Sequence, residues 1–328
     1  MARPKTLQEA VQYFSEEQVC IDAVASMRWP DGAYCPACLA KKPYYLKTQK
    51  RFKCRECRRQ FSVKLGTIFE DSPIPLQKWM VATWMLANCK NGVSSHEIAR
   101  ALGITQKSAW FMLHRLRLGM KEHMPNTKLG GSDGGSVEVD EAFFGGKIQN
   151  MHKDRRIRAL QGSSKTSGFS GKTAVIGLLD RESRQIRAKV LPNVKRETLQ
   201  EEILENVKYG SAVYTDNAVA YDRLNWHYVH EVVNHANEYV RGQVHTNGLE
   251  NFWSLFKRHL RGTYVAVEPF HLDRYLDEQV FRFNNRKKPM DDYARFEKVL
   301  SQVAHKRLTY AELTGKTEEG RATTPEPF

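Results

Sequence analysis

The order of apolar and polar positions along the chain predicts a helical first region that ends at a flexible linker. Apolar residues recur at helical spacing from Leu7 to Met27, and short alternating segments follow around two Cys-x-x-Cys turns. The pattern is helical again from Leu76 to Met120, in three apolar blocks separated by Asn91-Gly92 and by Gly103. A Gly/Ser-rich run at 125–136 follows, and we interpret it as the linker.

Beyond the linker, the pattern is that of strands mixed with helices. Strands are predicted at 137–140, 173–180, 186–191, 212–215 and 228–233, and helices at 197–207, 247–261 and 268–285. A polar, basic stretch at 150–172 predicts a mobile loop, and the polar tail from Gly315 is expected to fray. The expected segments are an N-terminal helix with a ribbon, a helical segment, the linker, a strand-rich domain and a C-terminal helix with its tail, at 1–65, 66–124, 125–136, 137–290 and 291–328.

The charge balance favours a polyanionic partner. The 328 residues include 51 Lys and Arg against 37 Asp and Glu, a formal net charge of +14, and the sequence pI is about 9.5. Such an excess attracts phosphates and steers association, so a polyanion is the first expected partner. No uncharged apolar run approaches the ~20 residues of a membrane-spanning helix, and the first residues lack the apolar core of a signal peptide, so neither a membrane nor secretion is expected.

Four of the six cysteines have the spacing of a four-thiolate zinc site. They form two Cys-x-x-Cys pairs separated by fifteen residues, Cys35 with Cys38 and Cys54 with Cys57. Zinc prefers four tetrahedral thiolates, and the metal would supply folding free energy to a segment with little core of its own. The alternative is a pair of redox-active or chance dithiols. Basic and aromatic neighbours favour DNA as the ribbon's partner, and Cys20 and Cys89 are expected to be buried thiols.

The segment from Val93 to Trp110 has the pattern of a DNA-binding helix-turn-helix. Ser94 and Glu97 form a capping box for the first helix, Gly103 permits a left-handed turn, and Thr105 can cap the second helix. The side chains expected to face a DNA groove or its phosphates are Gln106, Lys107, Ser108, His114, Arg115 and Arg117. The alternative is an ordinary helical hairpin that packs the core.

Three carboxylates fall where a two-metal site would need them. Asp140 lies in or at the end of the first strand after the linker, Asp216 ends another strand, and Glu250 lies on a helix. Bridging carboxylates can hold two divalent ions that activate an attacking oxygen and stabilise a leaving one, and Mg²⁺ suits oxygen ligands of this kind. Lys257 follows Glu250 by two helical turns, so its ammonium group can hold a phosphate beside the metals.

Each of these acids alone is weak evidence, because aspartates at strand ends usually serve turns and helical glutamates are usually solvated. We expect such structural roles for Glu138, Glu141, Asp180, Asp222 and Glu231. The aromatic pair Phe252 and Trp253 is expected in the core. The order of strands and helices nevertheless matches the ribonuclease-H-like fold, which places two such aspartates on adjacent strands beside an acid from a helix. The predicted class is therefore α/β: a ribonuclease-H-like mixed sheet with flanking helices, preceded by a small zinc ribbon and a helix-turn-helix segment.

From about residue 10 to residue 290, the sequence closely resembles the bacterial insertion-sequence transposases that join an N-terminal zinc ribbon to a DDE integrase-like domain. This is the ISXO-like group, related to the eukaryotic Merlin transposases. The most specific matching motifs are Val137-Glu138-Val139-Asp140-Glu141, Gly145-Gly146-Lys147, Tyr214-Thr215-Asp216 and His245-Thr246-Asn247-Gly248-Leu249-Glu250-Asn251-Phe252-Trp253-Ser254-Leu255-Phe256-Lys257-Arg258.

The resemblance implies cleavage of double-stranded DNA at the terminal inverted repeats of an insertion sequence, and joining of the freed 3′ hydroxyls to target DNA. Asp140, Asp216 and Glu250 would hold Mg²⁺ or Mn²⁺, and the zinc ribbon and helix-turn-helix would recognise the ends. A homodimer or larger assembly and a cytoplasmic, nucleoid-associated location are also expected. The rival interpretations are a catalytically idle DNA-binding protein, a ribonuclease-H-like nuclease and a zinc-ribbon transcription factor.

Overall fold

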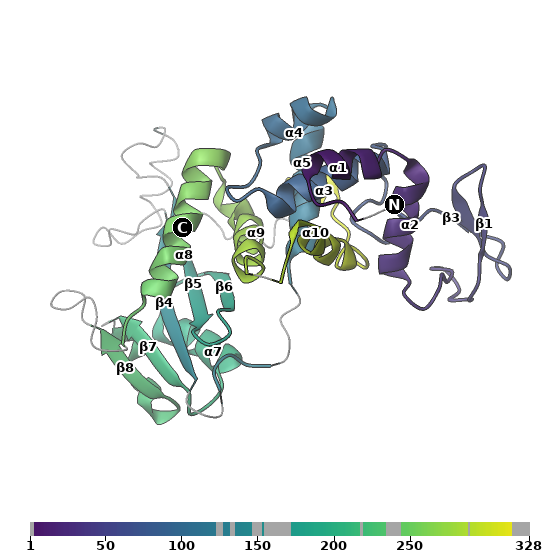
Figure 1. The fold of residues 1–328 in the computed structure, drawn as a ribbon. Helices are drawn as coiled ribbons and strands as arrows, with labels where there is room; N and C mark the ends of the chain where they lie inside the picture. Colours follow the sequence, from purple (N-terminus) through teal and green to yellow (C-terminus); the bar gives the residue numbers. More distant parts are fainter. Residues whose placement is uncertain are drawn as a thin grey trace. The chain divides into compact units, whose positions relative to one another are not determined.

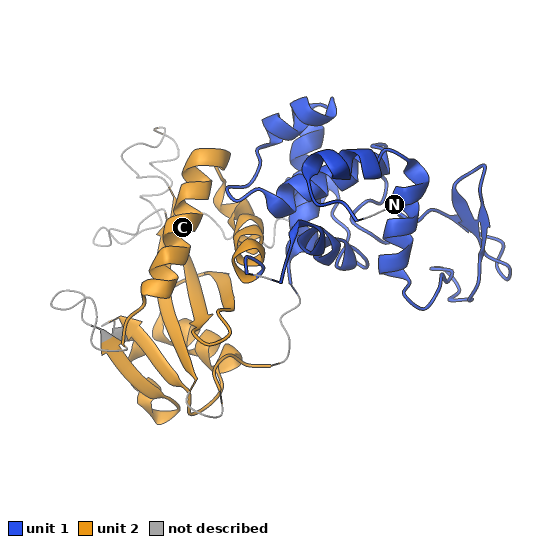
Figure 2. Ribbon diagram, viewed as in Figure 1, with its two compact units in different colours: residues 1–122, 285–317 blue, residues 123–284, 318–328 orange. Residues whose placement is uncertain are grey.

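The protein divides into two compact units, shown in Figure 2. The computed structural model describes residues 3–122, 127–131, 135–145, 153, 172–216, 219–233, 244–287 and 289–316. Unit 1 comprises residues 1–122 and 285–317, and unit 2 comprises 123–284 and 318–328. Nearly all of the predicted loop at 150–172, and the tail beyond 316, lie outside the described residues. The segment that we expected to stand apart at 291–328 contributes its described part to unit 1.

Unit 1 combines a small antiparallel sheet with a group of helices (Figure 1). The sheet contains β1 (Tyr44–Leu46), β2 (Arg51–Lys53) and β3 (Gln60–Phe61) in the order β1-β2-β3. The helices are α1 (Leu7–Tyr13), α2 (Glu17–Arg28), α3 (Leu76–Asn88), α4 (Ser95–Leu102), α5 (Gln106–Met120), α10 (Asp292–Ser301) and α11 (Tyr310–Leu313). Helix α3 is buried over most of its surface, as its nearly continuous apolar sequence predicts.

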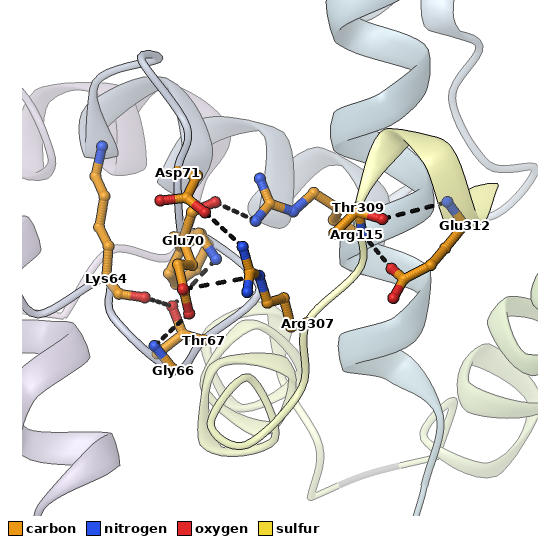
Figure 3. Close-up of polar contacts among 10 residues, drawn as sticks. Lys64, Gly66, Thr67, Glu70, Asp71, Arg115, Arg307, Thr309 and Glu312 are labelled. Carbon is orange, nitrogen blue, oxygen red and sulfur yellow. Dashed lines mark hydrogen bonds and ion pairs between the residues drawn. The ribbon is translucent and has the colours of Figure 1, made fainter. Parts of the chain in front are cut away.

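The C-terminal segment completes the core of unit 1. On α10, the buried ring of Phe296 lies 5.0 Å from that of Phe14 and 5.7 Å from that of Trp84, centroid to centroid. After α10, the backbone of Val303 accepts a hydrogen bond from Ile68 N–H at 3.1 Å, and Arg307 pairs with the carboxylates of Glu70 and Asp71 (Figure 3). Unit 2 is therefore inserted into the chain of unit 1, whose core is built from segments that precede and follow the insertion.

Unit 2 is a five-stranded mixed sheet covered by helices on both faces. Its strands are β4 (Ser136–Phe144), β5 (Thr173–Asp180), β6 (Ile186–Leu191), β7 (Ala212–Asp216) and β8 (Val229–Val233), in the order β6-β5-β4-β7-β8. Pairing is antiparallel among β4, β5 and β6 and parallel from β4 through β7 to β8. The helices are α7 (Arg196–Asn206), α8 (Asn247–His259) and α9 (Leu272–Asn284), with a π-helical turn at Leu260–Tyr264 and 3-10 turns at Val219–Tyr221, Leu224–Trp226 and Pro269–His271.

The predicted ribonuclease-H-like fold class is confirmed by this arrangement of helices around a mixed sheet, and the predicted strands and helices of unit 2 are all present. Helix α7 packs on one face of the sheet, and α8 and α9 pack on the other. Among the described residues of both units, no helix has the length and apolar composition needed to cross a membrane.

Helix α8 lies unusually close to β5 because a glycine faces it. A Cβ atom added to Gly177 would lie 2.7 Å from Trp253 Cζ2 and 2.9 Å from Leu249 Cδ2, both on α8. The neighbouring β5 residues Val175 and Leu179 face the same way and are fully buried against the helix. The sheet can therefore hold α8 at this distance only while position 177 lacks a side chain.

We predict that Gly177→Ala lowers the free energy of unfolding by about 1–3 kcal/mol, because the added methyl group would overpack the contact between β5 and α8. Gly262→Ala is the control, since a Cβ at position 262 would meet nothing within 4 Å. Urea unfolding of the full chain provides the measurement. Equal stability of Gly177→Ala and wild type would contradict the close-packing interpretation.

Candidate active site and zinc centre

The register of two parallel strands brings Asp140 and Asp216 together. Strands β4 and β7 pair from Ser136–Ala212 to Glu138–Tyr214. Two residues beyond the last pair on each strand, Asp140 and Asp216 are level with each other. Carboxylate oxygens of Asp140, Asp216 and Glu141 all lie within 4.8 Å of one another. The predicted pair of aspartates is thus adjacent in space, and the sequence analysis missed the third member of the group, Glu141.

The three carboxylates are crowded and largely removed from water. Burial raises the pKa of Asp140 to about 6, and the negative charge of Asp216 adds to the rise, while a hydrogen bond from Trp253 opposes it. Burial likewise raises the pKa of Glu141 to about 7, opposed by a hydrogen bond from Tyr221. A divalent cation would offset this repulsion. Three carboxylates that offer only oxygen ligands fit a hard ion such as Mg²⁺ or Mn²⁺, so the residues present suit the metal that the fold implies.

Helix α8 supplies the opposite side of the site. Glu250, Trp253 and Lys257 follow one another along one face of this helix. The indole N–H of Trp253 donates to Asp140 Oδ2 at 3.0 Å. A hollow of about 750 Å³ is lined by Asp140, Glu141, Ala142, Glu250, Trp253, Ser254, Lys257, Arg258, Arg261 and Gly262. The structure therefore brings the predicted Glu250 and Lys257 to the same hollow as Asp140, although the Glu250 carboxylate is not one of the compact group of three.

Trp253 was expected in the core, and it is 4% exposed. Its ring packs against those of Phe144 and Phe252, and its N–H reaches Asp140. A tryptophan that is buried with its N–H on a carboxylate both fills the core and fixes an acidic side chain. In the sequence, only the spacing of three residues between Glu250 and Trp253 points to this second role.

A buried carboxylate on β4 anchors the start of α8. Glu138, which we expected to be structural, is fully buried, and its Oε2 accepts the backbone N–H of Leu249 at 3.0 Å. Its Oε1 pairs with Arg181 Nε at 2.7 Å, and Arg181 in turn contacts His245 Nδ1 at 2.6 Å. A Cβ on Gly248 would lie 2.7 Å from Glu138 Oε2, so only glycine allows this approach. The anchor fixes the first turn of α8, which carries Glu250.

The four ribbon cysteines converge as predicted. Their sulfurs lie within 4.8 Å of one another, with Cys35 Sγ to Cys57 Sγ at 3.7 Å and Cys38 Sγ to Cys54 Sγ at 3.5 Å. A tetrahedral zinc with Zn–S bonds of about 2.3 Å has sulfur–sulfur edges of about 3.8 Å, so the site fits Zn²⁺. Of the two remaining cysteines, Cys20 is buried as expected, whereas Cys89 is partly exposed.

The local structure of α4 and α5 agrees with the helix-turn-helix pattern. Ser94 and Glu97 form the predicted capping box, Gly103 is left-handed at φ 60°, and Thr105 accepts the N–H of Ser108. At the start of α5, Gln106 and Lys107 are exposed, and Ser108 is half-buried. These residues are accessible to a partner.

Two arginines of α5 do not face outward as we expected. Arg115 is 4% exposed and Arg117 is 1% exposed. The Arg115 guanidinium donates to the backbone carbonyl of Glu70 (Figure 3). It also lies 5.6 Å from the centre of the Trp79 ring. The expectation of groove contacts is therefore wrong for these two residues, and also for His114, which is fully buried. The cause is the packing of other helices around the second half of α5, which also buries Leu113 and Leu116.

The fold and the site define a zinc-ribbon protein with a ribonuclease-H-like domain that gathers acidic side chains at its central strands. The family model for an ISXO2-like transposase domain matches residues 132–284, and the model for a transposase zinc-ribbon domain matches residues 15–60. The chain belongs to this family of transposases. The resemblance stated from the sequence motifs is confirmed.

Two relatives support the same family. An uncharacterized protein in transposable element ISH50 of Halobacterium salinarum is 27% identical over 261 residues, which are 76% of this chain and 85% of the relative. An uncharacterized transposase-like protein of Haemophilus influenzae is 39% identical over 97 residues, 29% of this chain and 78% of the relative. A chain of the simian T-cell lymphotropic virus intasome in complex with PP2A regulatory subunit B56 gamma is 13% identical, over 61% of this chain and 67% of that one. The TM-score of this structural match is 0.28.

We predict that, without a divalent ion at the carboxylates, the protein is stabilised by Asp140→Asn at high pH. The raised pKa values of Asp140 and Glu141 mean that the folded state binds more protons than the unfolded state between about pH 4 and pH 7, so stability falls as pH rises through this window. With the zinc ribbon loaded and no Mg²⁺ or Mn²⁺ present, the free energy of unfolding of Asp140→Asn should exceed that of wild type by about 1–3 kcal/mol at pH 8, and by less at pH 5.

Urea unfolding at the two pH values provides this measurement. Asp222→Asn is the matched control, because Asp222 is exposed and pairs only with Arg196 among the ion pairs of the described residues. A variant Asp140→Asn that is less stable than wild type at both pH values would show that the carboxylate group contributes no repulsion to the folded state.

Proposed function

We propose that the protein is a DDE-type transposase that binds the terminal inverted repeats of an insertion sequence, cleaves the DNA at these ends and joins the 3′ hydroxyls to target DNA. The observation that carries the proposal is the juxtaposition in unit 2 of Asp140 and Asp216 on parallel strands with Glu250 and Lys257 on the facing helix. Membership of a transposase family supports the same reaction class.

Acidic and basic side chains would divide the chemistry between them. Asp140 and Asp216, completed by Glu250, would hold the metal ions. Bound Mg²⁺ or Mn²⁺ would lower the pKa of an attacking water and offset charge on the leaving oxygen. The cations Lys257, Arg258 and Arg261 line the same hollow and would bind phosphates of the DNA strand. Trp253 would keep the Asp140 carboxylate in one orientation through its hydrogen bond.

Unit 1 would supply the sequence specificity that phosphoryl transfer lacks. The zinc ribbon is held to α2 by Trp29, whose ring lies 5.2 Å from that of Phe52 and 6.2 Å from that of Phe61. The exposed Gln106 and Lys107 at the start of α5 are placed as the first residues of a recognition helix would be. Because two ends must be joined together, we propose that the active form is a homodimer or a larger assembly.

We predict that Asp216→Asn abolishes end cleavage and leaves end binding intact. The change removes a metal ligand, which should lower the cleavage rate by more than about 100-fold, while phosphate contacts elsewhere remain. The assay uses purified full-length protein, labelled duplexes with the inverted repeats that flank its own gene, and Mg²⁺ or Mn²⁺ against a chelator.

Asp222→Asn is again the control and should cleave at the wild-type rate. Specific end binding by the wild type without metal-dependent cleavage would support an idle DNA-binding protein instead. Loss of end binding by Asp216→Asn at low salt would contradict the separation of binding from catalysis.

We further predict opposite effects for two cations of α5. Lys107→Ala should weaken binding to the inverted repeats and reduce the salt dependence by about one phosphate contact. Because it loses only an exposed contact with the Tyr310 ring, its melting temperature should fall by less than that of Arg115→Ala. Arg115→Ala should lower the melting temperature, because it breaks a buried hydrogen bond to the Glu70 carbonyl, and should leave the affinity of the folded protein unchanged. Fluorescence anisotropy at several salt concentrations and thermal unfolding separate the two effects. Unchanged affinity in Lys107→Ala would remove the start of α5 from the DNA contact.

A further inference from the structure

The third carboxylate of the compact group reaches it from the other face of the sheet. Successive β4 side chains alternate between faces, so Asp140 points toward α8 whereas Glu141 points toward the side of α7 and Tyr221. Both residues lie beyond the last pair between β4 and β7, Glu138–Tyr214. This edge of β4 is therefore open to side chains from both faces, and the carboxylate of Glu141 lies within 4.8 Å of those of Asp140 and Asp216.

A buried tyrosine fixes the orientation of Glu141. The hydroxyl of Tyr221 donates a hydrogen bond to Glu141 Oε1. Tyr221 is 1% exposed and belongs to the core between the sheet and α7, so its hydroxyl has little freedom to move. A carboxylate has two oxygens, and one hydrogen bond to Oε1 leaves Oε2 available to a cation. Ligating carboxylates are typically held in this way by a hydrogen bond from outside the metal's shell.

The neighbours of Glu141 also favour a role as a metal ligand over a purely structural role. A glutamate whose only role is to accept a hydrogen bond from Tyr221 would serve better away from Asp140 and Asp216, since like charges in a desolvated site repel. A cation among the three carboxylates removes that cost. With Glu250 across the hollow, four carboxylates face the site, and their charge balances that of two divalent ions.

We propose that Glu141 is a fourth metal ligand of the active site, acting with Asp140 and Asp216, and that Tyr221 is the positioning residue that orients its carboxylate. The proposal rests on the proposed function of this site and adds two residues to it. Glu250, whose carboxylate is outside the compact group, then completes the metal site from α8.

The test is metal binding by the full-length protein without DNA. Isothermal titration with Mn²⁺ compares the wild type with Glu141→Gln, Tyr221→Phe, Asp140→Asn and the control Glu201→Gln, which replaces an exposed carboxylate of α7. We expect Glu141→Gln to weaken Mn²⁺ binding by at least about 10-fold and Tyr221→Phe by a smaller factor of up to about 10-fold. Asp140→Asn should lose binding, and Glu201→Gln should keep the wild-type affinity.

A second readout separates a ligand from a structural residue. Terbium(III), a hard ion, should occupy the carboxylate site and not the thiolates, and its luminescence lifetimes in H₂O and D₂O give the number of bound waters. Glu141→Gln should increase this number by about one, because water replaces the lost oxygen. Wild-type Mn²⁺ affinity in Glu141→Gln, or weaker binding with unchanged hydration, would overturn the role of Glu141. Unchanged affinity in Tyr221→Phe would overturn the positioning role, and wild-type binding by Asp140→Asn would overturn the proposed site as a whole.

Discussion

The candidate active site depends on the hydrogen bond and the ion pair that the buried carboxylate of Glu138 makes. This carboxylate binds the backbone of Leu249 and the side chain of Arg181, and thereby ties the first turn of α8 to the central strand β4. Breaking such a pair on one side leaves a buried charge without compensation, so the arrangement is strongly specified. Gly177 and Gly248 allow the approach, since a side chain at either position would collide with the partner element. The position of Glu250 and Lys257 relative to Asp140 follows from this contact.

Strand β4 also carries the buried carboxylates that destabilise the protein when no cation is bound. Within four residues, β4 presents Glu138, Asp140 and Glu141, and only Glu138 has an arginine partner in the described part of unit 2. Burial raises the pKa of both Asp140 and Glu141, and the negative charge of Asp216 adds to the rise in each. Repulsion among these carboxylates destabilises the folded protein without a cation. A bound cation removes this repulsion, so the folded protein is more stable with metal than without it. Functional sites often lower the stability of a protein locally. Here the rest of the fold is stable enough to hold the unfavourable carboxylate cluster in place.

The sequence predicted most of the fold because its local patterns are strong. Strand and helix positions, the capping box at Ser94 and the four-cysteine cluster depend on neighbours a few residues apart. The insertion of unit 2 into unit 1 could not be predicted in this way, because Phe296 contacts Phe14 across almost the whole chain. Nor could the burial of Arg115 and Arg117: charge favours the surface, and only the tertiary packing around α5 overrides that preference.

In the candidate site, the aspartates at 140 and 216 were predictable because residues at the same level of adjacent parallel strands lie side by side whatever the details of packing. Glu141 was not, because alternation assigns it to the opposite face from Asp140. Its inclusion depends on where the pairing of β4 with β7 stops and on a tyrosine eighty residues away in the sequence. Trp253 illustrates the same limit, since its apolar ring predicts burial and says nothing of the acceptor for its N–H. The residues that bear charge are thus visible in the sequence, whereas those that orient the charge become visible only in the folded structure.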